Sequence, residues 1–338
     1  MRAAFKPWTL LTYQNDAGED HHTPPPPIGS NRLEDYWLPI LPQMAAETPT
    51  PDAILAEVIV VDMTSAVEQH ATSALTATTT TRLSAVSSPI ATRTSYTSGA
   101  NGAYNVTLQF KGSWTMALQD VFITAANRIS ATIIGDVKNV KVGSLMVDDI
   151  VISAELKAID GAGGILGQAG PTAVRVGSYL PATAMMRFDS VDVASFHAQG
   201  LFDEIVTHEM MHAVGIGSIW ASKALLSGGG FIGPNAVAQY GKLVDAYAAS
   251  HGGSTTLANG VKLTKGAVPI ETAGGAGTAR VHWSEAVFDS EMMTGWLDTV
   301  KPGQAMVTNP MSALTSASLK DLGYVVAVRP PADLFYLG

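Results

Sequence analysis

The middle of the chain switches between two hydrophobic periods, one typical of strands and one typical of helices. Residues 105–110 alternate apolar and polar side chains, which predicts a strand with one buried face. Residues 115–129 repeat apolar side chains at helical spacing and predict an amphipathic helix. Its expected buried side comprises Leu118, Val121, Phe122, Ala125 and Ala126. Further strands are expected at residues 145–159, 173–176 and 185–191, with a flexible glycine loop at residues 161–164.

Three more segments carry helix signals. Residues 201–212 place Asp203 and Glu204 in a first turn, where acidic side chains favour a helix N-terminus, and glycines follow as stop signals. Residues 235–249 predict a helix bracketed by glycine clusters. The final helix is expected to begin at Asn309 as its N-cap, with Pro310 at its first position.

Composition narrows the class of protein. A chain of 338 residues is long enough for one or two domains with a large core. Its net charge of −9 argues against a nucleic-acid-binding surface. No segment has the roughly 18 consecutive apolar residues of a membrane span. There is no cysteine, so disulfides play no part in its stability.

The predicted helix at residues 201–212 ends in His208-Glu209-Met210-Met211-His212. Histidines four positions apart on a helix lie roughly 6 Å apart on one face, so both imidazoles can bind one metal ion. Glu209 is rotated by about 100° around the helix axis, which places its carboxylate beside the metal, where it can accept a proton from a bound water. This is the H-E-x-x-H pattern of zinc peptidases.

Two histidines do not complete such a site, because a catalytic zinc usually has three protein ligands. Ser218 occupies the position of the third histidine in the commonest metzincin spacing, so that short form is absent. His251, in a glycine- and serine-rich loop, and His282 are the histidines further along the chain. Glu285 and Glu291 are candidates if the third ligand is a glutamate. The spacing alone leaves these alternatives open.

Taken together, three features resemble the leishmanolysin-type metzincin metallopeptidases, in a bacterial form. These are the His208–Gly215 motif, His282 with Met293 eleven positions later, and the stretch at residues 309–324. The resemblance starts near Tyr104 and covers roughly two thirds of the chain. It implies a zinc-dependent endopeptidase that hydrolyses peptide bonds of proteins, with zinc held by His208, His212 and His282.

The same resemblance assigns further roles and a fold. Glu209 would be the catalytic base, and Met293 would form a methionine turn beneath the ligands. An extended peptide would pair with the strand at residues 185–191, expected at the edge of the sheet. The implied fold is α+β, with a twisted mixed sheet and the active-site helix in an N-terminal subdomain at residues 104–217. A mostly irregular and helical C-terminal subdomain, with an insertion between the zinc ligands, would follow at residues 218–338.

The first hundred residues are expected to lie outside this core. Residues 1–50 predict a proline-rich linker or pro-segment, and residues 51–103 an Ala/Thr/Ser-rich pro-region or N-terminal extension. The first residues do not form a recognisable signal peptide, because Pro7 and a polar run interrupt the apolar stretch. We nevertheless expect a secreted protein. The missing cysteines exclude a cysteine-switch latency mechanism, and the final residues lack a lipid-anchor tail.

Two rival interpretations stay open. One is a zinc peptidase with a glutamate as third ligand. The other is a zinc-binding module for adhesion or binding that lacks catalytic activity. Calcium is conceivable as a further metal, although no dense acidic loop motif indicates it. The sequence does not indicate an oligomeric state.

Overall fold

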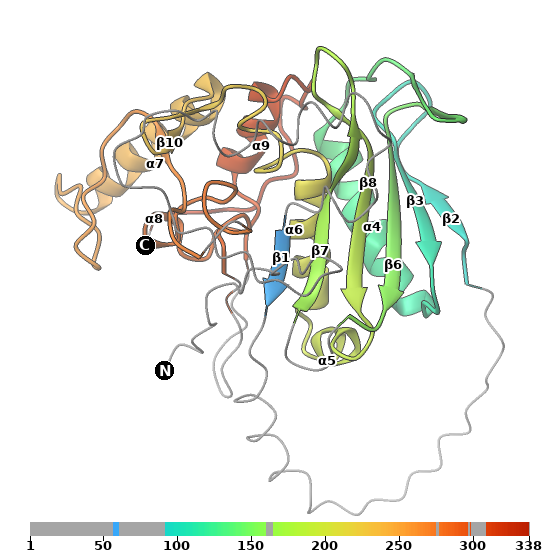
Figure 1. The fold of residues 1–338 in the computed structure, drawn as a ribbon. Coiled ribbons are helices and arrows are strands. Elements are labelled where there is room, and N and C mark those ends of the chain that lie inside the picture. Colours follow the sequence, from blue (N-terminus) through green and yellow to red (C-terminus); the bar gives the residue numbers. More distant parts are fainter. Residues whose placement is uncertain are drawn as a thin grey trace, which may run out of the picture.

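A mixed sheet forms one side of the molecule, and helices with short strands form the other (Figure 1). The computed structural model describes residues 57–60, 92–159, 165–274, 277–296, 298 and 309–337. The sheet order in this part of the chain is β1-β7-β8-β6-β3-β2. These strands are β1 (Glu57–Val60), β7 (Ile165–Val174), β8 (Pro181–Asp189), β6 (Ile150–Lys157), β3 (Val106–Lys111) and β2 (Ser95–Thr97). A separate hairpin joins β4 (Val140–Val142) to β5 (Leu145–Val147).

The sheet combines both strand directions. β3, β6 and β8 are parallel neighbours, whereas β7 runs antiparallel to β8, β1 antiparallel to β7, and β2 antiparallel to β3. The expected α+β class with a mixed sheet is therefore confirmed. Of the two N-terminal segments expected at residues 1–50 and 51–103, only residues 57–60 and 92–103 fall within the described ranges.

Two strand predictions need correction. The strand expected at residues 173–176 is β7, which begins earlier, at Ile165; Gly167, Gly170 and Pro171 are poor strand formers and obscure its pattern. The expectation that residues 185–191 form a sheet edge is wrong. β8 lies between β6 and β7 in the sheet. The preceding strand, β7, pairs antiparallel with β8 and so covers the edge that was expected to be open.

The helix α4 (Met116–Thr132) confirms the amphipathic prediction for residues 115–129. Thr115 is its N-cap, and the threonine hydroxyl accepts a hydrogen bond from the backbone N–H of Leu118 at 3.3 Å. The five apolar side chains expected on its inner face are all buried. They pack toward the sheet and the helix α6 (Phe202–Ala213), which occupies the same face of the sheet.

An aromatic cluster joins these elements. The fully buried ring of Phe122 on α4 makes edge-to-face contacts with four other rings, at centroid separations of 4.9–6.1 Å. These four rings belong to Phe110, Trp114, Phe188 and Phe202. Since Phe188 lies on β8 and Phe202 begins α6, the cluster fixes the start of α6 against the sheet.

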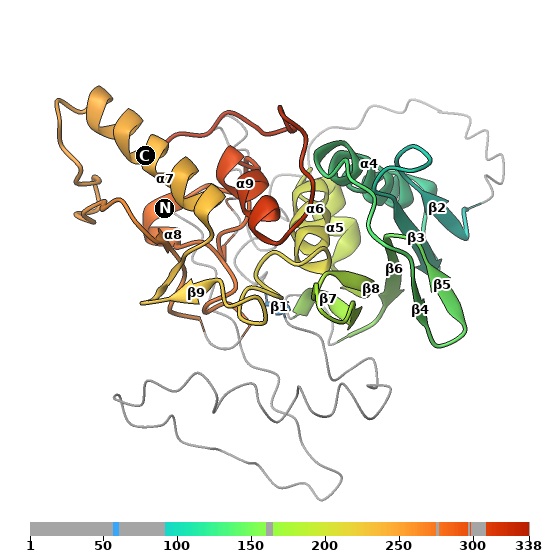
Figure 2. The same ribbon diagram turned by 90° about the horizontal axis from the view of Figure 1, so that it is seen from above.

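The remaining helices precede or follow α6 in the chain, and those that follow it lie on its side away from α4 (Figure 2). They are α5 (Val193–Ala198), immediately before α6, and α7 (Pro234–Ser250), α8 (Glu285–Phe288) and α9 (Ala313–Asp321), which follow it. The short strands β9 (Leu226–Ser227), β10 (Gly230–Phe231) and β11 (Val268–Pro269) form a second small sheet. No helix among the described residues is both long and apolar enough to cross a membrane.

The prediction for residues 235–249 is confirmed by α7, whereas the expected start of the last helix is wrong. α9 begins at Ala313, and Ser312 is its N-cap, with its hydroxyl accepting from the N–H of Thr315. Asn309 instead donates hydrogen bonds to Glu204 on α6. A tertiary partner therefore replaces the local capping role that the sequence indicated.

Replacing Phe122 by Ala should lower the free energy of unfolding by about 3–5 kcal/mol, because it leaves a cavity where α4, β8 and α6 meet. Urea denaturation followed by circular dichroism measures the change. Met146→Ala is the control, since the Met146 side chain is 63% exposed. Equal effects of the two substitutions would show that the aromatic cluster does not anchor α6.

Candidate metal centre

The first two candidate ligands lie on the helix α6, in its buried part. Every residue from Ile205 to Ala213 is buried, so this part of the helix is covered on all sides. His208 and His212 lie one turn apart on the same face, and their side chains are 5% and 1% exposed. Gly215, with φ +118°, ends the helix and allows the chain to turn immediately after the second histidine.

The third imidazole comes from a distant segment. His282 lies 70 positions after His212 and is completely buried. The Nε2 atoms of the three rings form a small triangle: 3.0 Å separates His208 from His212, 3.1 Å His212 from His282, and 3.2 Å His208 from His282. The structure thus brings together all three histidines that the family resemblance implied.

Backbone carbonyl groups set the protonation of all three rings. The Nδ1 atom of His208 lies 2.7 Å from the carbonyl oxygen of Met292. For His212 the partner is the carbonyl of Ile216 at 2.8 Å, and for His282 that of Thr278 at 3.0 Å. Because a carbonyl oxygen only accepts, Nδ1 is the donor in each ring, and in the neutral imidazole Nε2 then presents its lone pair. The three lone pairs point into one buried space.

This arrangement fits a metal ion. Three Nε2 atoms directed at one another from neutral rings suit a cation placed between them. A tetrahedral ion with metal–nitrogen bonds of about 2.0–2.1 Å separates its nitrogen ligands by about 3.3–3.4 Å. The observed separations of 3.0–3.2 Å are close to that value. The three histidines thus form a compact group of possible metal ligands, with one ring nitrogen of each within 4.8 Å of the other two.

The two other residues implied by the resemblance adjoin the site along the chain: Glu209 follows His208, and Met293 follows Met292, whose carbonyl bonds to His208. Glu209 directly follows His208 on α6 and is completely buried. Met293 is also completely buried, and its carbonyl oxygen accepts from the backbone N–H of Trp283 at 2.9 Å. The turn that contains Met293 is therefore connected to the segment of His282 and, through the carbonyl of Met292, to His208.

The rival third ligands lie outside the histidine triangle. The His251 ring stacks on Tyr247 at a centroid separation of 3.9 Å, at the end of α7. Glu285 begins α8. The Glu291 carboxylate accepts four hydrogen bonds from its own turn and from the start of α9. Burial raises the pKa of the Glu291 carboxyl, and these hydrogen bonds act against that rise.

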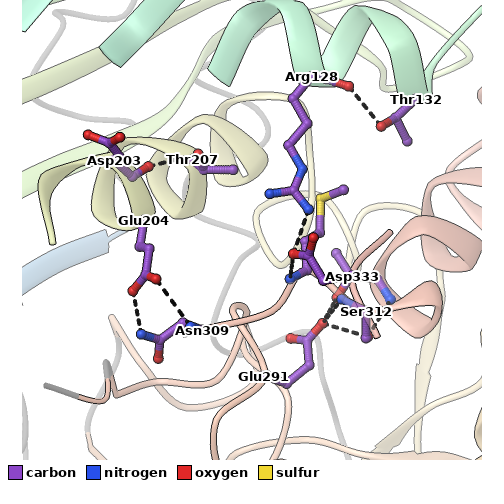
Figure 3. A network of polar contacts seen from close by, with 11 residues as sticks. Arg128, Thr132, Asp203, Glu204, Thr207, Glu291, Asn309, Ser312 and Asp333 are labelled. Carbon is purple, nitrogen blue, oxygen red and sulfur yellow. Dashed lines mark hydrogen bonds and ion pairs between the residues drawn. The ribbon is translucent and has the colours of Figure 1, made fainter. Parts of the chain in front are cut away.

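Several contacts that support α6 have no signature in the sequence. Asn309 donates from its backbone and side-chain nitrogens to the Glu204 carboxylate (Figure 3). Burial raises the pKa of that carboxyl, against the effect of the Asn309 donors. The Ser218 hydroxyl donates to the carbonyl of His212 at 2.7 Å, and the Tyr324 hydroxyl to that of Val214 at 2.8 Å. These bonds satisfy carbonyl groups at the end of α6.

A group of three aspartates is relevant to whether the protein binds calcium. Carboxylate oxygens of Asp136, Asp148 and Asp149 lie within 4.8 Å of one another. Asp149 is buried and accepts hydrogen bonds from the backbone N–H groups of Asn105 and Val137, whereas the other two carboxylates are exposed. Exposed acidic side chains commonly lie together without an ion, so this group adds no support for calcium, which the sequence left conceivable but did not indicate.

Comparison with known proteins adds no family assignment. No protein-family model matches the chain, and a search of curated proteins finds no match. The function must therefore be inferred from the geometry of the site itself.

The turn that follows α6 closely approaches the segment of His282, and this contact can be tested. A Cβ atom on Gly217, which has φ +73°, would overlap the carbonyl oxygen of Val281, the residue before His282. Gly217→Ala should therefore displace His282 and weaken metal binding, measured by titration with Zn²⁺. Gly228→Ala is the matched control, because Gly228 has φ +58° but open space around a Cβ.

Both alanines should cost roughly 1–2 kcal/mol of stability for the left-handed backbone. Only Gly217→Ala should also lose metal affinity. If the two variants bind Zn²⁺ equally well, the contact between Gly217 and Val281 does not control the position of His282.

Proposed function

We propose that the protein is a zinc-dependent endopeptidase of the metzincin kind, in which His208, His212 and His282 hold the zinc and Glu209 is the general base. The observation that carries this proposal is the convergence of three buried Nε2 lone pairs, with Glu209 next to one of them on α6. Protein or peptide chains are the proposed substrates. Secretion stays an expectation from the sequence.

Zinc is the metal that this ligand set supports best. Three neutral imidazoles suit zinc, and three protein ligands leave a fourth position for water or substrate, as in catalytic zinc sites. When bound, zinc supplies a Lewis acid and lowers the pKa of its water towards about 7. The histidines contribute fixed orientation, because each Nδ1–H is held by a backbone carbonyl.

Glu209 performs the proton transfers in this proposal. Its carboxylate accepts a proton from the attacking water and later gives it to the leaving amine of the cleaved peptide. The helix holds its backbone one position from His208, which keeps the carboxylate within reach of the metal position in this proposal. Because this region is buried, the surrounding low dielectric strengthens electrostatic interactions with the reacting groups.

The mode of substrate binding differs from the sequence-based expectation. β8 cannot pair with a substrate strand, since both of its edges already pair with β6 and β7. The outer edge of β7 pairs with β1, which comes from residues 57–60 of the same chain. Addition of a substrate strand to β8 is therefore not part of the proposed function.

Of the two rival interpretations, the inactive zinc module is the one that experiment must exclude. A structural zinc site needs no general base, so a glutamate directly after the first ligand of an H-E-x-x-H helix favours the enzyme. The glutamate-ligand peptidase lacks support, because the hydrogen bonds of Glu291 engage its carboxylate elsewhere and Glu285 does not join the histidine group.

Glu209→Gln should keep one zinc per chain and lower peptidase activity by about 10²–10⁴-fold, because it removes the general base and leaves the ligands in place. Zinc content and cleavage of denatured casein, measured on both proteins, provide the test. Wild-type activity in the variant would exclude the role of Glu209. Zinc without activity in both proteins would favour the binding module.

His282→Ala should lose the zinc, because it removes one of three ligands from a buried site. His251→Ala is the matched control, since His251 lies at the end of α7 and outside the triangle. Metal analysis after dialysis measures both. Retention of zinc by His282→Ala would revive a glutamate as the third ligand.

A further inference from the structure

One buried carboxylate outside the ligand set connects three segments around the histidines. Glu291 is completely buried, and its Oε2 atom accepts the backbone N–H of Met293 at 2.6 Å. Its Oε1 atom accepts from the backbone N–H of Ser312 at 3.0 Å, the Ser312 hydroxyl at 2.6 Å and the Thr315 hydroxyl at 2.6 Å. Figure 3 shows Glu291 directed toward Ser312. Four donors on two oxygens match a carboxylate, which is an acceptor only.

The first arm of this network leads to His208 through a single peptide group. The N–H of Met293 and the C=O of Met292 belong to the same planar peptide unit. Its N–H donates to Glu291, and its C=O accepts from Nδ1 of His208 at 2.7 Å. Hydrogen bonds in such a chain polarise one another, so the carboxylate makes the Met292 oxygen a stronger acceptor. A stronger acceptor at Nδ1 makes Nε2 of His208 a better metal ligand.

The second arm leads to the neighbour of His282. The Thr315 hydroxyl donates to Glu291 and accepts from the indole N–H of Trp283 at 2.8 Å. The backbone N–H of Trp283 in turn donates to the carbonyl of Met293 at 2.9 Å. Trp283 directly follows His282, so the same carboxylate restrains the segment that delivers the third ligand.

We propose that Glu291 is a positioning residue for the metal centre, acting on His208 through the peptide of Met292 and Met293 and on His282 through Thr315 and Trp283. This inference rests on the proposed metal site. It gives Glu291 a role different from the ligand role considered from the sequence. The carboxylate is essential to it, because a glutamine would turn an NH₂ group toward at least one of the four donors.

The test uses four variants of the full-length chain. Glu291→Gln removes the charge, Thr315→Val removes the hydroxyl that joins Glu291 to Trp283, and Thr315→Ser keeps that hydroxyl. Ser130→Ala is the stability control: Ser130 is buried on α4, where its hydroxyl bonds to that of Ser98 at 2.5 Å. Zn²⁺ affinity is measured by competition with a chelator, and stability by urea denaturation of the metal-free proteins.

We expect Glu291→Gln to weaken Zn²⁺ binding by about 10- to 100-fold, as for other outer partners of metal-binding histidines. Thr315→Val should weaken it by a smaller factor, and Thr315→Ser should restore the wild-type affinity. Ser130→Ala should lower stability without changing Zn²⁺ affinity. If Glu291→Gln or Thr315→Val loses stability but binds Zn²⁺ as tightly as Ser130→Ala, Glu291 is merely structural and the proposal is overturned.

Proton NMR of the Nδ1–H groups provides a second readout, which general destabilisation does not move. In Glu291→Gln the resonance of His208 should shift upfield, whereas that of His212, bonded to Ile216, should stay in place. If Glu291→Gln does not fold, the two Thr315 variants decide, and equal Zn²⁺ affinity in both overturns the proposal. A wild-type chain that binds no Zn²⁺ overturns the metal site as well. Wild-type binding with unaffected variants overturns only the role of Glu291.

Discussion

The rest of the site depends on one constraint, the hydrogen bonds that hold three imidazole Nδ1 atoms to backbone carbonyl groups. Those bonds turn every Nε2 lone pair inward, and they require three separate stretches of backbone to lie at fixed places. The end of α6 supplies the carbonyl of Ile216, and the segment before His282 supplies that of Thr278. The turn at Met292 supplies the third. A displacement of any one of these carbonyl groups would reorient the ring bonded to it, and in this buried site no solvent would replace the lost hydrogen bond.

The C-terminal half of the molecule is organised around this requirement. Asn309 bonds to Glu204 near the start of α6, and Tyr324 bonds to Val214 at its end, so α6 is held at both ends by residues about a hundred positions away. Pro310 accepts from the backbone N–H of Met292, which places the turn beside His208. These ties join the sheet half and the C-terminal half into one framework, and the histidine triangle lies between them.

Hydrophobic periodicity predicted the helices that show a strong apolar repeat in their own sequence. The helices α4, α6 and α7 have strong repeats and occur where expected, and the spacing of His208 and His212 placed both on one face. β7 was misplaced, because Gly167, Gly170 and Pro171 hide a strand that only its neighbours stabilise. His282 could be chosen only through the resemblance, since no local rule relates residues 70 positions apart. The carbonyl groups that bond to the three Nδ1 atoms could not be predicted from the sequence, because every residue has a carbonyl group. The identity of the metal and the catalysis remain proposals.

The separation of His212 and His282 along the chain also has a consequence for folding. An ion held by both would close a loop of 70 residues, and the unfolded chain would lose conformational entropy much as it does when a disulfide closes a loop of similar length. The contribution of the bound ion to the free energy of unfolding would then grow with the logarithm of the free metal concentration. For a chain without cysteine, covalent cross-links set by redox conditions are impossible. Metal supply would control this cross-link instead.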